Sequence, residues 1–193
     1  MDLTAVPAHP TIVRVTSSTP RLPYRVIFVC MGNICRSPMA EAVLRTKLDR
    51  AGLSAQVVVD SAGTGSWHVG DPADQRTRAA LSARGYPEEH LARVFDRQWF
   101  GERDLVIALD LDNQRTLRRM APDRAQADAV RLLREFDPDA DGLEVPDPYY
   151  GGTADFALAL DQVEAACDGL VDHLRTTVRP AAPASAPCGA TPA

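Results

Sequence analysis

Short apolar runs and longer stretches with helical spacing alternate along this chain. Five runs of buried-strand length occupy residues 25–29, 56–59, 92–95, 105–109 and 130–133. Continuous apolar runs of this kind are typical of strands that are buried on both faces of a sheet. We therefore predict a strand at each of these five places, with the third and fifth strands short.

Stretches with apolar residues at helical spacing separate these strands. In residues 37–51 the side chains of Val43, Leu44 and Leu48 fall on one face, and Gly52 follows where a helix would end. The alternation of strands and helices is typical of an α/β domain whose parallel sheet carries helices on both faces. Further helices are predicted over residues 74–84, 111–120 and 154–178.

The two ends of the chain differ in composition from its centre. Residues 1–23 are rich in Pro, Thr and Ser, and residues 179–193 consist largely of Pro, Ala and other small residues. Such segments lack the apolar residues of a core, so we expect a flexible N-terminal extension and a disordered C-terminal tail. The folded domain is then predicted to span residues 24–178.

Composition and charge narrow the class of protein. The 193 residues are 45% hydrophobic and 24% charged, which is typical of a soluble globular protein, and the net charge is -5. A nucleic-acid partner is not expected, because it would require a basic patch. No stretch approaches the roughly 18 apolar residues of a membrane span, and no signal peptide is recognisable, so we expect a cytoplasmic protein.

The cysteines and histidines give no sign of a disulfide framework or a metal site. Cys30, Cys35, Cys167 and Cys188 lack the spacings of a disulfide-rich protein and are expected to be reduced. The four histidines are scattered, and no paired Cys/His set joins them. We therefore predict neither a metal ion nor a cofactor.

The segment CMGNICRS, residues 30–37, lies where the first strand turns into the first helix. Parallel sheets bind their ligands at this edge, and the inward-pointing N–H groups of such a loop form an anion site. Gly32 permits close approach of the backbone, and Asn33 tolerates a left-handed conformation. The residues expected to bind a phosphate group are Met31, Gly32, Asn33, Ile34, Cys35, Arg36 and Ser37.

The two ends of this loop carry the candidate chemistry. Cys30 lies where the loop dipoles converge, a setting that favours the nucleophilic thiolate. Arg36 offers a planar fork for two phosphate oxygens, and the Ser37 hydroxyl can donate to the thiolate. Cys and Arg at this spacing are a weak signal alone, but the strand, the glycine-containing loop and the helix start around them make the signal specific.

The segment VCMGNICRSPMAEA, which contains this loop, resembles the signature of the low-molecular-weight protein tyrosine phosphatases. The similarity covers residues 24–178 and includes SAGT at 61–64, WHVG at 67–70 and VPDPYYG at 145–151, in this order. The resemblance implies a three-layer α/β fold with a four-stranded parallel sheet, helices on both faces and a phosphate-binding loop after the first strand.

The resemblance also implies hydrolysis of phosphotyrosine. Cys30 would attack phosphorus and form phosphocysteine, and Arg36 would bind the phosphoryl group. Asp147 would be the general acid for the leaving phenolate and then the general base for water. Pro146 and Pro148 restrict the backbone on both sides of Asp147, which suits a positioned acid.

Further residues of the resemblance concern the substrate and the loop. Trp67, Tyr149 and Tyr150 fit as aromatic walls of a slot that admits phosphotyrosine and is too deep for phosphoserine. His90 matches a family histidine that hydrogen-bonds the loop asparagine. The residues expected to support the loop are therefore Asn33, Ser37 and His90.

Two regulatory features are also expected. In the family, the second loop cysteine, here Cys35, can form a reversible disulfide with the nucleophile under peroxide. Tyr149 and Tyr150 lie in a loop that should be exposed, which makes them candidate targets of a tyrosine kinase. Besides this kinase, the expected partner is a phosphotyrosine-containing protein substrate.

Three alternatives share the fold or the loop. Arsenate reductases relay oxidation through further cysteines near the loop, but no cysteine lies between Cys35 and Cys167. Protein-arginine phosphatases carry Thr at the position of Ile34, whose apolar side chain favours an aromatic substrate, as does Trp67. A catalytically inactive phosphotyrosine-binding module would lack the nucleophile, the arginine or the acid, and all three are present here.

Overall fold

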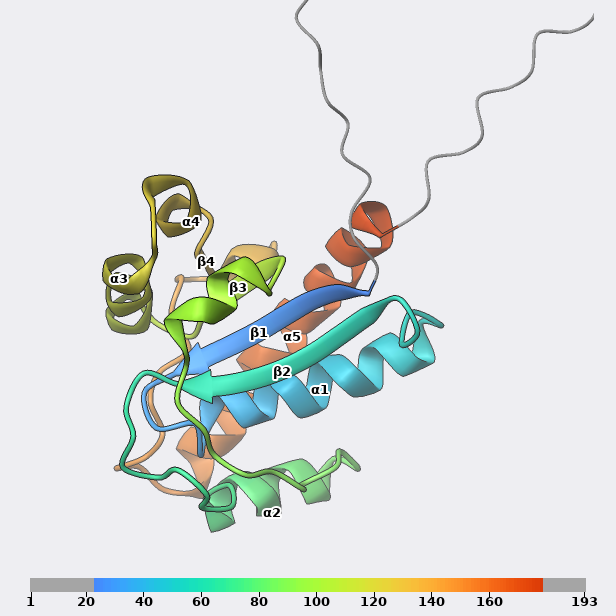
Figure 1. Cartoon of the computed structure of the whole chain (residues 1–193). Coiled ribbons are helices and arrows are strands. Elements are labelled where there is room, and N and C mark those ends of the chain that lie inside the picture. Colours follow the sequence, from blue (N-terminus) through green and yellow to red (C-terminus); the bar gives the residue numbers. More distant parts are fainter. Residues whose placement is uncertain (1–22, 179–193) are drawn as a thin grey trace, which may run out of the picture.

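A four-stranded parallel sheet lies at the centre of the structure, a computed structural model that describes residues 23–178 (Figure 1). The strand order is β2-β1-β3-β4. The central strand β1 pairs with β2 on one side and β3 on the other, and its last five residues are buried, which accounts for its continuous apolar run. The strands are β1 (Tyr24–Cys30), β2 (Val57–Gly63), β3 (Leu105–Ala108) and β4 (Arg131–Leu132).

Helices cover both faces of this sheet (Figure 1). Val26 and Phe28 of β1 join the core under α1 and α5, whereas Ile27 and Val29 join a second core with Phe100 and residues of α3. The predicted α/β fold, with a four-stranded parallel sheet between helices, is confirmed. The helices are α1 (Arg36–Arg50), α2 (Gln75–Ala83), α3 (Leu111–Met120), α4 (Arg124–Asp128) and α5 (Thr153–Thr177), with 3₁₀ helices η1 (Arg97–Gly101) and η2 (Leu133–Phe136).

β1 and β3 lie within one residue of their predicted bounds at each end, whereas β2 is longer and β4 is shorter than predicted, each for a physical reason. β2 continues beyond its apolar start because Asp60 pairs with Arg103 and the Ser61 hydroxyl is hydrogen-bonded, so both polar residues are accommodated in a strand. The run at 130–133 forms only the two-residue strand β4, because the chain turns into η2 at Leu133.

The strand predicted at 92–95 is wrong. This segment makes a single parallel bridge, between Val94 and Gly63, and no ladder. Gly63 is the last residue of β2, so the strand offers no further residue to pair with. The short helix α4 was not predicted.

The segments expected to be a flexible extension, residues 1–23, and a disordered tail, residues 179–193, lie outside the described residues except for residue 23. Within residues 23–178, no helix combines the length and the apolar character that crossing a membrane would require.

Candidate active site

The loop between β1 and α1 is held in a tight curl. Asn33 has a φ of 56°, in the left-handed region that asparagine tolerates. The Thr64 N–H donates to the Cys30 carbonyl over 2.9 Å, which joins the loop to the residues after β2. Gly63 makes this close approach possible, because a Cβ atom there would lie 2.7 Å from the Met31 carbonyl oxygen.

The Asn33 side chain braces the loop from inside. Its Nδ2 donates to the hydroxyls of Ser37 and Ser61, both over 2.9 Å, and its Oδ1 accepts from the Arg93 N–H over 2.9 Å. The Nε2 atom of His90 lies 2.7 Å from the Asn33 backbone oxygen, so this nitrogen carries the imidazole proton. The predicted pairing of His90 with Asn33 is therefore present, through the main-chain carbonyl.

Two hydrogen-bond donors converge on the sulfur of Cys30. The Asn33 N–H lies 3.3 Å from Sγ, and the Ser37 hydroxyl lies 2.9 Å from it. Because Ser37 already accepts from Asn33 Nδ2, its own proton is free for Sγ or for the Ala62 carbonyl at 3.3 Å. A negatively charged sulfur would thus receive charge-assisted hydrogen bonds from both donors.

The guanidinium group of Arg36 is buried, with 2% of the residue exposed, and is held between two carboxylates. One Nη1–H donates to Asp110 Oδ2 over 2.6 Å, the same nitrogen donates to the Val145 carbonyl over 3.0 Å, and Nη2 donates to Asp147 Oδ2 over 2.6 Å. Burial opposes the charge of Arg36, but the thiolate form of Cys30 and the two carboxylates together raise the pKa of the guanidinium. Its buried Nε has no hydrogen-bond partner within the described residues, so one donor remains available to a ligand.

Asp110 is a member of this site that sequence reasoning missed. Its Oδ2 accepts from Arg36, and its Oδ1 accepts from the Asn113 N–H over 2.6 Å, which caps the start of α3. Its position in the sequence could have identified it, because Asp110 lies two residues after the end of β3, at the sheet edge where ligands of parallel sheets bind.

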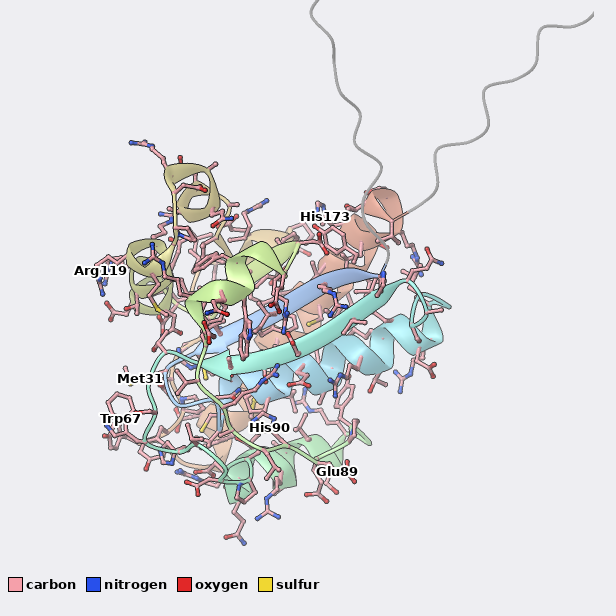
Figure 2. The ribbon with its side chains drawn as sticks, in the orientation of Figure 1. Met31, Trp67, Glu89, His90, Arg119 and His173 are labelled. Carbon is pink, nitrogen blue, oxygen red and sulfur yellow. The ribbon has the colours of Figure 1, made fainter. Side chains whose placement is uncertain are left out.

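A cavity of about 320 Å³ opens between the loop and three aromatic side chains. Trp67, Tyr149 and Tyr150, the predicted slot residues, all line it together with the loop and Asp147, and His68 is a further lining residue that was not predicted. The Trp67 ring packs so closely on Gly65 that a Cβ atom there would overlap it. Figure 2 shows Trp67 beside the loop, at the edge of the sheet where β1 and β2 end.

The remaining cysteines of the described region differ from Cys30 in their setting. Cys35 is 4% exposed, and burial raises its pKa to about 12, so it is a neutral thiol at physiological pH. Cys167 is fully buried in α5, and burial raises its pKa as well. Within residues 23–178 no group of three or more His, Cys, Asp or Glu side chains is arranged to hold a metal ion.

The buried position of Arg36 leads to a prediction for Asp110. Asp110→Asn retains a cap for α3, because Asn caps helices as well as Asp, but it leaves the guanidinium with one carboxylate fewer. We expect a loss of about 1–3 kcal/mol in the free energy of unfolding, measured by urea denaturation. Inorganic phosphate should restore part of this loss, since it supplies negative charge beside Arg36.

Asp123→Asn is the matched control, because Asp123 caps α4 in the same way, through the Gln126 N–H over 2.8 Å, and forms no ion pair with a buried arginine within the described residues. Its effect should stay within about 0.5 kcal/mol, as for other surface changes. Equal losses in the two variants would mean that Asp110 contributes only a helix cap.

Comparisons with known proteins agree on one family. The sequence model of the family "Low molecular weight phosphotyrosine protein phosphatase" matches residues 25–180. A low molecular weight protein-tyrosine-phosphatase of Streptomyces coelicolor is 55% identical over 157 residues, which is 80% of this chain and 96% of the relative. Low molecular weight protein-tyrosine phosphatase A of Mycobacterium tuberculosis is 45% identical over 152 residues, 78% of this chain and 91% of the relative.

Solved structures give the same result. A protein tyrosine phosphatase from Entamoeba histolytica, with Hepes in its active site, superimposes with a TM-score of 0.77 at 37% identity, over 79% of this chain and 97% of the other. A Drosophila arginine phosphatase superimposes with a TM-score of 0.72 at 33% identity, over 78% and 97%. The family match, the relatives and the loop after β1 lead to one conclusion: the chain belongs to the low molecular weight protein-tyrosine-phosphatase family.

Proposed function

We propose that this protein hydrolyses phosphotyrosine in phosphoproteins through a phosphocysteine intermediate on Cys30. The observation that carries the proposal is a sulfur within hydrogen-bond distance of the Asn33 N–H and the Ser37 hydroxyl, at the other end of one loop from a buried arginine whose Nε is unpaired within the described residues. A nucleophile and an anion-binding cation at the two ends of one loop are what attack on a phosphoryl group requires.

The first step forms a bond between Cys30 Sγ and phosphorus and breaks the bond to the tyrosine oxygen, which takes a proton from Asp147. In the structure the Asp147 carboxylate is paired with Arg36 Nη2. The substrate phosphate competes for this nitrogen and for the unpaired Nε, and the Asp147 carboxylate that it displaces takes up a proton from solvent and then faces the leaving oxygen.

The second step returns the enzyme to its starting state. Water attacks phosphorus, Asp147 takes a proton from it, and the sulfur–phosphorus bond breaks with its electron pair on Cys30. The Ser37 hydroxyl, 2.9 Å from Sγ, then donates to the departing thiolate. The backbone N–H groups of residues 31–36 and the Arg36 guanidinium hold the phosphoryl oxygens in both steps.

The lining of the cavity supports phosphotyrosine as the substrate. Trp67, Tyr149 and Tyr150 offer aromatic faces at its entrance, and the apolar Ile34 lines it beside the loop. Protein-arginine phosphatase is the second candidate, because two structurally similar proteins are named arginine phosphatases. One of them is the Drosophila protein at 33% identity. Ile34 argues against it, because its apolar side chain lines the cavity and offers no hydroxyl group to orient a charged guanidinium.

We also propose that residues 24–178 form the phosphatase domain and that the protein acts in the cytoplasm. The location is supported by the chemistry of the site, because a nucleophilic thiol needs a reducing compartment. The three cysteines of the described region, Cys30, Cys35 and Cys167, are free thiols.

Hydrolysis of phosphotyrosine, phosphoserine and phosphoarginine peptides, side by side with EDTA present, tests the function. We expect turnover of phosphotyrosine alone, and Cys30→Ser should abolish this turnover while it keeps the binding of inorganic phosphate. Preference for phosphoarginine would show that Ile34 and Trp67 have been misinterpreted. If reduced wild-type protein hydrolyses none of the three, a phosphotyrosine-binding module becomes the better interpretation.

We further propose that Cys35 protects Cys30 from irreversible oxidation. Peroxide oxidises the Cys30 thiolate to sulfenic acid, and the Cys35 thiolate then attacks this sulfur, forms the disulfide and expels hydroxide. Because burial raises the Cys35 pKa to about 12, its thiolate fraction, and with it the rate of disulfide formation, should rise about tenfold for each pH unit between pH 7 and 9.

Recovery of activity by dithiothreitol after a peroxide pulse measures this protection. Wild type should recover, Cys35→Ser should not, and Cys167→Ala, which removes a thiol from the core of α5, should recover as wild type does. If wild type fails to recover even after mild exposure, Cys35 has no such role.

A tyrosine kinase is a further partner that we propose. Tyr150 is 97% exposed and Tyr149 is 38% exposed, so both hydroxyl groups are within reach of a modifying enzyme. A phosphate on Tyr150 would place negative charge three residues from Asp147 at the entrance of the slot. Mass spectrometry of the protein from its native source should find phosphate on one of the two tyrosines, and its absence from both would set the proposal aside.

A further inference from the structure

Arg76, on α2, holds the backbone of the loop that carries Asp147. Its Nη1 donates to the Gly151 carbonyl over 2.9 Å, and its Nη2 donates to the Tyr149 carbonyl over 3.0 Å. The guanidinium carbon also lies 5.9 Å from the centroid of the Tyr149 ring and 4.5 Å from that of Phe156, at the start of α5. Arg76 thus contacts the acid loop, which we define as residues 147–152, at two carbonyls and one ring.

Asp74 fixes the orientation of this guanidinium. Arg76 Nε donates to Asp74 Oδ1 over 3.0 Å, and Nη2 donates to Oδ2 over 2.8 Å, which is a two-point contact with a carboxylate that is 14% exposed. The hydrogen bond from Arg76 holds the pKa of Asp74 below its usual value, so the pair stays charged. Since both groups are tied at two points, the fork that reaches the acid loop has little freedom to turn.

Asp74 is also hydrogen-bonded to the predicted phosphate-binding loop of residues 30–37, which we call the phosphate loop. Its N–H donates to the Ile34 carbonyl over 2.9 Å, and its side chain accepts from the Arg76 N–H and caps α2. A continuous set of hydrogen bonds therefore leads from Ile34 through Asp74 and Arg76 to Tyr149. The Tyr149 N–H in turn donates to Asp147 Oδ1 over 3.1 Å, next to the carboxyl oxygen that meets Arg36.

We propose that Arg76 is a positioning residue for the general acid: it sets the place of Asp147 relative to the phosphate loop. The inference rests on the proposed role of Asp147 in proton transfer. In the part of the chain that the structure describes, Arg76 is the one side chain that hydrogen-bonds a carbonyl of the acid loop. The internal bond from Gly151 N–H to the Pro148 carbonyl shapes the loop without locating it in the molecule.

Leaving-group dependence separates positioning of an acid from a general contribution to stability. p-Nitrophenyl phosphate expels a weakly basic phenolate that needs little help from an acid, whereas phenyl phosphate expels a strongly basic one. The ratio of kcat/KM for these two substrates therefore reports the contribution of Asp147 to the first step. A loss of stability alone lowers both values together and leaves the ratio unchanged.

Arg76→Ala should lower kcat/KM for phenyl phosphate by about tenfold relative to p-nitrophenyl phosphate, a part of the factor of about 10²–10⁴ that a positioned acid supplies. Arg76→Lys keeps the positive charge beside Asp74 but lacks the planar guanidinium, so its ratio of kcat/KM values should lie between those of Arg76→Ala and wild type. The same variant tests the proposal if Arg76→Ala fails to fold. Asp74→Asn keeps the α2 cap and should shift the ratio in the same direction by less.

The matched control is Arg78→Ala, on the same helix, whose Nε donates to the Ala73 carbonyl over 3.2 Å and forms no hydrogen bond to the acid loop within residues 23–178. It should keep the wild-type ratio. Asp147→Asn is the reference for full loss of the acid and should change the ratio more than Arg76→Ala does.

Equal losses on both substrates in Arg76→Ala and Arg76→Lys, while Asp147→Asn changes the ratio, would overturn the role of Arg76 and leave the proposed function intact. If Asp147→Asn leaves the ratio of an active enzyme unchanged, Asp147 is not the acid, and the role of Arg76 falls with it. Absence of turnover in wild type would instead contradict the proposed function as a whole.

Discussion

The site depends on one constraint, the burial of a positive charge at the carboxyl edge of the sheet. Arg36 is almost fully buried, and an unpaired charge in such a place would cost several kcal/mol. Asp110 comes from the segment after β3, and Asp147 comes from the loop before α5, so the guanidinium draws two distant parts of the chain to the end of β1. In the proposed mechanism the same charge binds the substrate phosphate, which competes with these two carboxylates.

A second constraint on the site is the conformation of the phosphate loop, whose N–H groups must face a ligand instead of one another. A left-handed Asn33 turns the chain, and the side chain of the same residue bonds Ser37, Ser61 and the backbone of Arg93. These partners come from α1, β2 and the segment after α2, so the conformation of the loop is stabilised by the whole fold. A loop held in this way costs no reorganisation when the phosphoryl group arrives.

Local sequence signals predicted the parts of the site that lie close together in the chain, and the family resemblance supplied more distant residues such as Trp67, His90 and Asp147. Cys30, Arg36 and Ser37 stand in one segment whose strand, turn and helix signals are local, and the helix at 111–120 was predicted with its observed bounds. Sequence reasoning missed Asp110 and Arg76 because the site residues that they contact, Arg36 and Tyr149, are 74 and 73 residues away in the sequence. An Asp at a helix start or an Arg on a helix is locally ordinary. β2 was predicted too short for the same reason, since the distant Arg93 and Arg103 make Asp60 acceptable in a strand.

The contact between Asp147 and Arg36 then determines how the acid can move. In the proposed mechanism, substrate phosphate and the Asp147 carboxylate are both negative and repel each other at the Arg36 guanidinium, so the phosphate displaces the carboxylate from Nη2. The backbone around Asp147 is restricted by Pro146 and Pro148, and its continuation is held at two carbonyls by Arg76. With the main chain held, rotation of the Asp147 side chain is the movement by which its carboxyl group would leave Arg36 in the proposed mechanism, and Asp147 lines the cavity proposed to hold the substrate. In the proposed mechanism, binding of the substrate and placement of its acid are therefore two results of one exchange of partners at Arg36.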